Sequence, residues 1–195
     1  MHRLYYDSGE EFMGNERMAK RCEFYPGEVL YGLVRLHEVT GDDKWLDAVI
    51  NNKFHLDGHY GVPEKNHWML YTLKHLYNYE KTERIYTHAK RIAESTIEAS
   101  PRNREIGNAC GIATFTEGLI CFLDIASRSS YAFGPSLKQR LIECIQENLV
   151  FQLKYRRPEG SFLLSEKQKI MRIDAVQHNV SGYMYYADCV AKGYI

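Results

Sequence analysis

The sequence predicts an all-α protein built from antiparallel helix hairpins. Apolar residues recur with the period of an amphipathic helix in seven separate segments. Short turns containing Gly, Asp or Pro separate these segments, as helix caps and helix breaks require. Outside the helical segments, the one strand-like run is Ser-Phe-Leu-Leu at residues 161–164, which predicts at most a small strand.

The first hairpin follows an irregular lead-in. Residues 1–24 are polar and have no period, so we expect a single helical domain over residues 25–195. Pro26 suits the first turn of a helix, Gly41 suits its end, and Asp42 suits the cap of the next helix. Because the turn at 40–42 is short, the two helices should be antiparallel neighbours.

The later helices follow the same pattern. A third helix should begin near Asn66, and a fourth should end before Pro101, because proline disfavours a helical residue in front of it. A fifth is expected over 112–126, and a sixth begins at Pro135. The polar segment 155–170 precedes a seventh helix from about Asp174 to Val190.

Composition limits the partners that we expect. The 195 residues include 25 Lys and Arg and 25 Asp and Glu, so the formal net charge is zero. A neutral chain has no general attraction to nucleic acid or to an anionic membrane, and we expect neither as a partner. The sequence has no apolar signal core at its start and no apolar run near the roughly 20 residues that span a bilayer. Five cysteines without a CxxC pair predict free thiols and a cytoplasmic protein.

Four segments resemble successive parts of six-hairpin-glycosidase-like (α/α)-toroid proteins. They are Phe-Tyr-Pro-Gly-Glu-Val-Leu-Tyr-Gly-Leu-Val-Arg-Leu-His-Glu-Val-Thr-Gly-Asp at 24–42, Asn-His-Trp-Met-Leu-Tyr at 66–71, Ala-Thr-Phe-Thr-Glu-Gly-Leu at 113–119 and Arg-Ile-Asp-Ala-Val-Gln-His at 172–178. The resemblance implies alternating inner and outer helices, with a cleft at one end of the ring. It also implies action on sugars as a hydrolase, a lyase or an epimerase.

The chain departs from the toroid pattern in two ways. It has about seven helices where a full toroid has twelve, so we expect an open or partial toroid. Apolar flanks exposed by an open arc favour a homo-oligomer or a neighbouring segment of a larger chain. Asn66 also stands where the resemblance implies an aspartate before His67 and Trp68, which removes one candidate carboxylate.

We expect one pocket where the inner helices of such a toroid begin, because helix N-termini offer free N–H groups and a partial positive charge. Glu117 and Asp174 are the candidate catalytic pair, since glycoside hydrolysis needs two carboxyl groups. Trp68 offers a flat face to a sugar ring. The other candidate substrate-binding residues are Glu28, His67, Arg172, Gln177 and His178.

Four of the candidate residues also have a purely structural interpretation. Glu28 could complement the helix dipole, Trp68 could fill the core, and Asp174 could cap the last helix. A carboxylate between apolar neighbours needs a partner, so Glu117 could simply pair with Arg172.

These residues leave three functions open. The first is a glycoside hydrolase that acts on uronic-acid-containing sugars. The second is a lyase or epimerase, in which an aspartate or histidine near an arginine abstracts a proton beside a uronate. The third is a non-catalytic helical-repeat module that binds a partner or serves as a structural piece. No cofactor is expected, and no metal, because the spacing of His55, Asp57 and His59 matches no zinc site.

Overall fold

The computed structural model describes residues 25–51 and 66–195, and these ranges contain helices and no named strand. The helices are α3 (Tyr25–Thr40), α4 (Asp43–Ile50), α6 (His67–Leu76), α7 (Glu83–Glu105), α8 (Ala109–Arg128), α9 (Pro135–Leu153) and α10 (Ile173–Ala191). The predicted all-α class is therefore confirmed. The expected lead-in at 1–24, Cys22, and His55, Asp57 and His59 lie outside the described residues.

Most helix boundaries follow from the capping residues in the sequence. The side chain of Asp42 accepts a hydrogen bond from the backbone N–H of Lys44, and that of Asn66 accepts from Met69, each at 3.1 Å. Gly41 ends α3 with a positive φ of 67°, the conformation that favours glycine. These three residues fix where α3 ends and where α4 and α6 begin.

The predicted end of the fourth helix before Pro101 is wrong, because α7 continues to Glu105. Pro101 is exposed, so its ring does not have to fit against a neighbouring helix. Beyond it, the side chain of Asn103 donates to the carbonyl of Ala99, and Arg104 donates to Asn148 Oδ1 of α9 at 2.5 Å. Contacts of this kind maintain the last turn of α7, although Pro101 lacks the N–H group that would donate a helical hydrogen bond.

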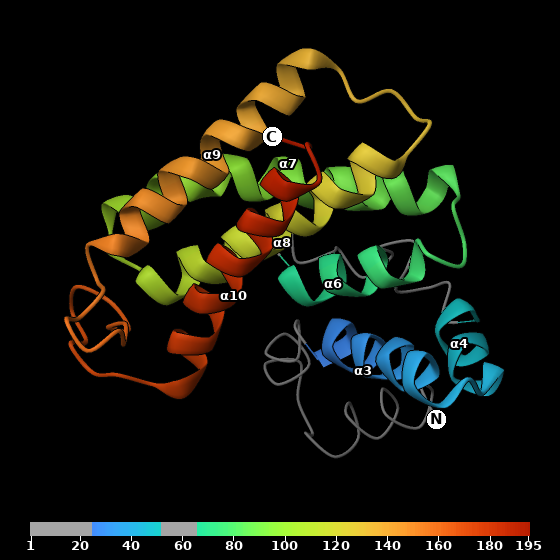
Figure 1. Ribbon diagram of the computed structural model, residues 1–195, viewed down its shortest axis with the longest axis horizontal. Helices are drawn as coiled ribbons and strands as arrows, with labels where there is room; N and C mark the ends of the chain where they lie inside the picture. The colour runs from blue at the N-terminus through green and yellow to red at the C-terminus, as the bar shows by residue number, and fades with distance from the viewer. Residues whose placement is uncertain (1–24, 52–65) are drawn as a thin grey trace, which may run out of the picture.

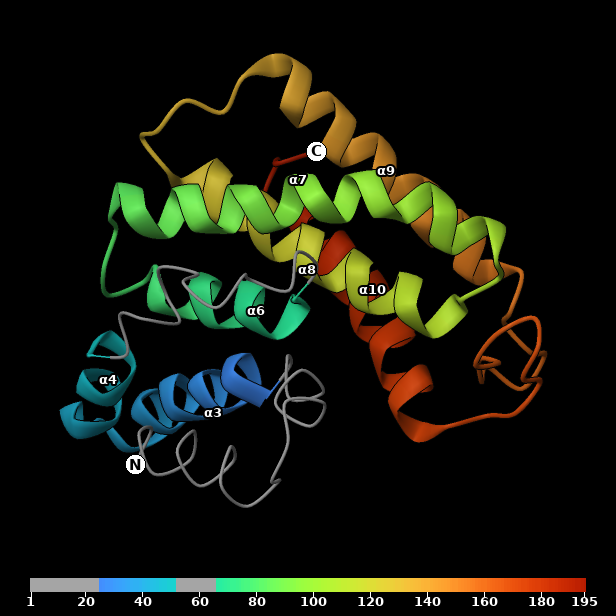
Figure 2. The ribbon, with the colours of Figure 1, turned by 180° about the vertical axis from the view of Figure 1, so that it is seen from behind.

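The helices form two rows. Helices α3, α6, α8 and α10 pack side by side in one row, while α7 and α9 pack against α8 from the other side (Figures 1 and 2). The short α4 packs against α3, and the division into inner and outer helices stays a prediction. The curvature of a toroid stays a prediction.

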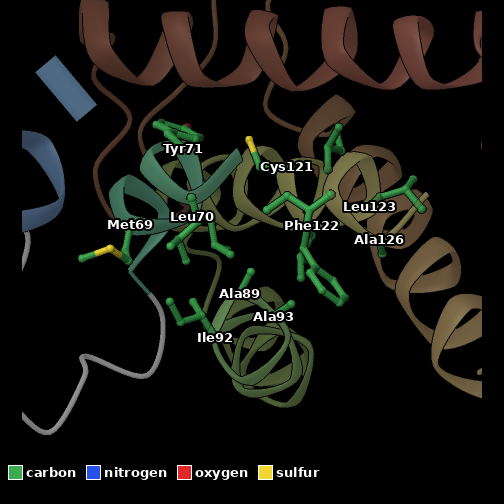
Figure 3. Packing of buried hydrophobic residues seen from close by; sticks show 14 of the residues in the cluster. Met69, Leu70, Tyr71, Ala89, Ile92, Ala93, Cys121, Phe122, Leu123 and Ala126 are labelled. Atoms are coloured by element: carbon green, nitrogen blue, oxygen red, sulfur yellow. The ribbon is translucent and has the colours of Figure 1, made fainter. Parts of the chain in front are cut away.

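The core lies between these rows, with α8 at its centre. Figure 3 shows Leu70 of α6 and Phe122 of α8 pointing toward α7. Tyr71 and Cys121 of the same two helices point away from α7. The buried α7 residues on the facing side are Ala89, Ile92 and Ala93.

Helix α8 is long and apolar enough to cross a membrane by length and composition. Of the apolar window in this helix, 83% is buried inside the protein, as in a core helix. Its apolar character is therefore explained by its central place between the two rows.

Close backbone contact brings α3 against α6. A Cβ atom on Gly27 would lie 2.7 Å from the backbone nitrogen of Met69, so only glycine fits there. The hydroxyl of Thr72 donates to the carbonyl of Gly27 at 3.0 Å and locks the crossing. This crossing places the aromatic residues of α3 next to the first turns of α6.

The segment between α9 and α10 has no sheet. Isolated antiparallel bridges join Arg156 to Phe162 and Leu163 to Met171, and both involve the predicted strand at 161–164. The strand-like run therefore makes single bridges in place of a strand.

Candidate functional site

A buried carboxylate joins α6, α8 and α10. Glu117 lies in the third turn of α8 and is only 2% exposed. Its Oε2 atom accepts a hydrogen bond from the hydroxyl of Tyr71 at 2.5 Å and lies 2.6 Å from Nδ1 of His178. We call Glu117, Tyr71 and His178 the carboxylate cluster.

The helix packing positions this cluster. Gly118 follows Glu117 on α8, and a Cβ atom there would lie 3.0 Å from Leu70 Cδ1 of α6. The absence of a side chain at this point allows α6 to approach α8, so that Tyr71 reaches Glu117. His178 comes from the second turn of α10, which packs on the same helix.

The hydrogen bonds fix the tautomer that we assign to His178. An ionised carboxylate only accepts hydrogen bonds, so Nδ1 of His178 carries the hydrogen in its contact with Glu117. The Nε2 atom of a neutral ring is then an unprotonated acceptor. Burial and the neighbouring charge of Glu117 raise the pKa of Tyr71 well above 10.0, so its hydroxyl stays a donor.

Aromatic rings surround the cluster on the side of α3 and α6. The ring of His67 lies 5.6 Å from that of His178 and 5.2 Å from that of Trp68. Tyr31 of α3 lies 5.9 Å from Trp68 and 5.5 Å from Tyr71. Trp68 is only half-buried, so the predicted stacking role and the core role both fit its position.

His67 is held neutral. Burial lowers the pKa of His67 to about 3, and the neighbouring His178 acts in the same direction. At neutral pH, His67 therefore contributes a neutral ring to the site and no positive charge.

Asp174 has a different environment from Glu117. It lies in the first turn of α10 and accepts two hydrogen bonds from Arg172, at 3.0 and 2.5 Å. Burial alone would raise the pKa of Asp174, but the bonds from Arg172 and from the backbone outweigh it and lower the pKa. Both side chains are substantially exposed. Asp174 is thus an ionised surface group, and Arg172 pairs with it and not with Glu117.

Two expectations about position are corrected. Glu117 lies in the third turn of α8, whereas the pocket was expected at helix starts. Glu28 and Gln177 are exposed, and within the described residues neither makes a hydrogen bond or ion pair with the carboxylate cluster. The structure therefore brings together Glu117, His178, His67 and Trp68, and leaves Glu28 and Gln177 on the surface.

Tyr71 is a site residue that the sequence analysis missed. A second residue, Tyr185 of α10, lies close enough to Glu117 for the charge of that carboxylate to act on its hydroxyl. Tyr71 follows His67 by four residues, and Tyr185 follows His178 by seven, so each lies on the same helix face as a candidate that was found. Helical spacing from the candidate histidines is the signal that would have identified them.

Asn66 has a structural role at the start of α6. Its side chain caps α6, and an aspartate would cap the helix equally well. The departure from the toroid pattern at Asn66 therefore leaves the carboxylate cluster unaffected. In the described part of the chain, no group of three or more His, Cys, Asp or Glu side chains is arranged to hold a metal.

Comparisons of the chain with protein-family models, with curated proteins and with solved structures find no match.

Proposed function

We propose that this chain is a carbohydrate-active protein of the (α/α)-toroid type, in which His178 moves a proton on a uronic-acid-containing sugar. The observation that carries the proposal is the double hydrogen bond on Oε2 of the buried Glu117, from Tyr71 and from Nδ1 of His178. The substrate class comes from the resemblance of four sequence segments to sugar-processing toroids.

The hydrogen bonds suit His178 to act as a general base. With Nδ1–H donated to Glu117, the lone pair of Nε2 is available to accept a proton. The carboxylate of Glu117 orients the ring and stabilises the imidazolium that forms. Tyr71 holds the same oxygen from the other side, so the carboxylate keeps its place when His178 gains a proton.

Proton abstraction fits a uronate. The hydrogen on the carbon next to the sugar carboxyl group is the acidic one, and Nε2 of His178 takes it. In a lyase, the electron pair of that C–H bond forms a C=C bond while the C–O bond to the next sugar breaks, and the leaving oxygen takes a proton from water. In an epimerase, water on the opposite face returns a proton to the same carbon, and the hydroxide that is left takes the proton from His178.

Hydrolysis by Glu117 and Asp174 is less well supported. It requires one carboxyl group that keeps its proton at working pH. The ion pair with Arg172 lowers the pKa of Asp174, and Glu117 already accepts two hydrogen bonds. These observations favour proton abstraction by His178 over general acid catalysis by a carboxyl group.

Product analysis with the full chain tests the proposal. Oligosaccharides of uronic acid are incubated in D₂O, and the products are examined for an ultraviolet-absorbing C=C bond, for deuterium next to the carboxyl group, and for new reducing ends. The first product identifies a lyase, the second an epimerase and the third, found alone, a hydrolase. His178→Ala should remove the product, whereas Gln146→Ala on the exposed face of α9 should not.

Two outcomes would overturn the proton-transfer proposal. New reducing ends without the other two signals would indicate hydrolysis. Uronate binding without any turnover, unchanged by Glu117→Gln, would indicate the non-catalytic binding module.

A further inference from the structure

Three polar side-chain groups lie beside the carboxylate cluster. They are the hydroxyl of Tyr31 on α3, the ammonium of Lys74 on α6 and the hydroxyl of Tyr185 on α10. In the described part of the chain, none of the three makes a hydrogen bond or an ion pair. Lys74 Nζ lies 4.9 Å from the ring centroid of Tyr185, and all three side chains are half-buried. We call them the donor cluster.

The donor cluster lies next to the carboxylate cluster along α6 and α10. The ring of Tyr31 lies 5.5 Å from that of Tyr71. Lys74 follows Tyr71 by three residues, a rise of about 4.5 Å along α6. Tyr185 follows His178 by seven residues, a rise of about 10 Å along α10. A ligand that reaches both clusters therefore extends past the reacting group.

Among the described residues, Lys74 has no ion-pair partner, and Glu38 and Asp124 pair with other groups. Glu38 lies 3.1 Å from Arg35 and 2.6 Å from Nδ1 of His75. Asp124 lies 2.6 Å from Arg128. A half-buried ammonium without a counter-ion favours an anion brought by a ligand.

The two tyrosines add donors and no charge. Burial raises the pKa of Tyr31 and of Tyr185, so both hydroxyls keep their protons at neutral pH. An ammonium and two hydroxyls together present hydrogen-bond donors to one region from three helices. Such a set suits the oxygen atoms of a carboxylate or a sulfate.

We propose that Tyr31, Lys74 and Tyr185 form a second subsite, which binds an anionic group on the sugar next to the one at His178. This inference rests on the proposed function, which supplies the sugar. It makes the ligand an oligosaccharide with acidic groups on adjacent residues.

Calorimetric titration of the full chain with matched trisaccharides tests the subsite. The probes are a trisaccharide of galacturonic acid, its carboxyl-reduced neutral form and a sulfated trisaccharide. The wild type should bind the uronate at least about tenfold more tightly than the neutral form. Lys74→Gln should remove that preference, and Tyr185→Phe should weaken uronate binding several-fold. Lys154→Gln is the matched control, because Lys154 also lies over an aromatic ring, 5.7 Å from that of Phe151 on α9.

The outcomes separate the subsite from the reaction. Equal affinity of the wild type for charged and neutral probes, or an unchanged preference in Lys74→Gln, would overturn the subsite even if His178→Ala abolishes turnover. Loss of the preference in Lys74→Gln would support the subsite even if no probe is turned over. If Lys74→Gln loses the preference for the charged probe, the sulfated probe shows what the subsite recognises. Sulfate bound as tightly as carboxylate would support a subsite that recognises negative charge alone. Weaker binding of sulfate would support one that recognises the planar carboxylate group.

Discussion

Two carboxylates on one face of α8 have opposite kinds of partners. Glu117 and Asp124 are seven residues apart, and both are almost fully buried, at 2% and 5% exposure. Asp124 lies 2.6 Å from Arg128 and 3.8 Å from Lys192. Glu117 lies within hydrogen-bond distance of Tyr71 and His178 instead.

The difference separates a structural carboxylate from a candidate functional one. Arginine and lysine stay charged at working pH, so they neutralise Asp124 permanently and join α8 to the end of α10. Histidine exchanges protons near neutral pH, and tyrosine donates a hydrogen bond without neutralising the charge. Burial is nearly the same at both positions, and only the partners distinguish them.

The largest expected effect is on turnover. Glu117→Gln removes the charge that orients His178, so turnover of a uronate oligosaccharide should fall by about 10²- to 10⁴-fold. Asp124→Asn removes an equally buried charge from the same helix face and should leave turnover within a few-fold. Steady-state kinetics, with circular dichroism to confirm folding, measure both variants. An equal loss in Asp124→Asn would contradict the distinction between the two carboxylates.

A second effect is the pH dependence of stability that comes from His67, which lies beside the carboxylate cluster. Burial lowers the pKa of His67 from 6.5 to about 3. Between these values the unfolded chain binds more protons than the folded one. The contribution of His67 to the free energy of unfolding is therefore complete above pH 6.5. As pH falls it is lost by up to roughly 1.4 kcal/mol per pH unit.

Urea unfolding of the wild type and of His67→Gln, from neutral pH to about pH 5, measures this slope. The variant should lose the part of the slope that comes from His67, whereas Lys154→Gln should keep it. Identical slopes in the wild type and His67→Gln would show that His67 is not held neutral.

A third effect is on the stability that the ion pairs of Asp124 provide near the C-terminal end of α8. Asp124→Ala leaves Arg128 and Lys192 without their buried partner. Because both cations are partly exposed, at 27% and 43%, we expect a loss of about 1–3 kcal/mol, below that of a fully buried pair. Urea unfolding provides the measurement.

Arg102→Gln, which removes an exposed ion pair with Glu105, is the control for Asp124→Ala. It should change stability by less than about 1 kcal/mol, because solvent screens an exposed ion pair. A change in Asp124→Ala no larger than that of the control would mean that this carboxylate is not structural.

A further effect on stability concerns the close backbone contact between α3 and α6. Gly27→Ala would push the first turn of α3 off α6 and should cost about 1–3 kcal/mol. Gly32→Ala on the same helix meets open space and should stabilise by up to about 1 kcal/mol. Thermal unfolding compares the two variants. Equal effects would mean that the close crossing of α3 and α6 is not needed.

Helix positions were predictable because local residues decide them. Asp42, Asn66 and Pro135 start helices with their own side chains or ring. The continuation of α7 through Pro101 was not predictable, because it depends on contacts such as that of Arg104 with Asn148 on another helix.

The site was predictable in part. A glutamate between apolar neighbours identified Glu117 as a group that needs a partner. Its partners depend on how far α6 and α10 rotate against α8, and the sequence does not specify that register. Arg172 pairs with Asp174, which is only two residues away in the chain. The alternative interpretation, in which Arg172 pairs with Glu117, is therefore wrong.

The most direct test is the protonation of the ring of His178, observed by ¹⁵N NMR of the full chain with labelled histidine at neutral pH. If Glu117 orients His178 as a base, the Nδ1 atom carries the hydrogen and Nε2 is unprotonated in the wild type. In Glu117→Gln this preference should be lost, while Asp124→Asn should keep it. A hydrogen on Nε2 in the wild type, or a tautomer that is unchanged in Glu117→Gln, would contradict the proposed role of the carboxylate cluster.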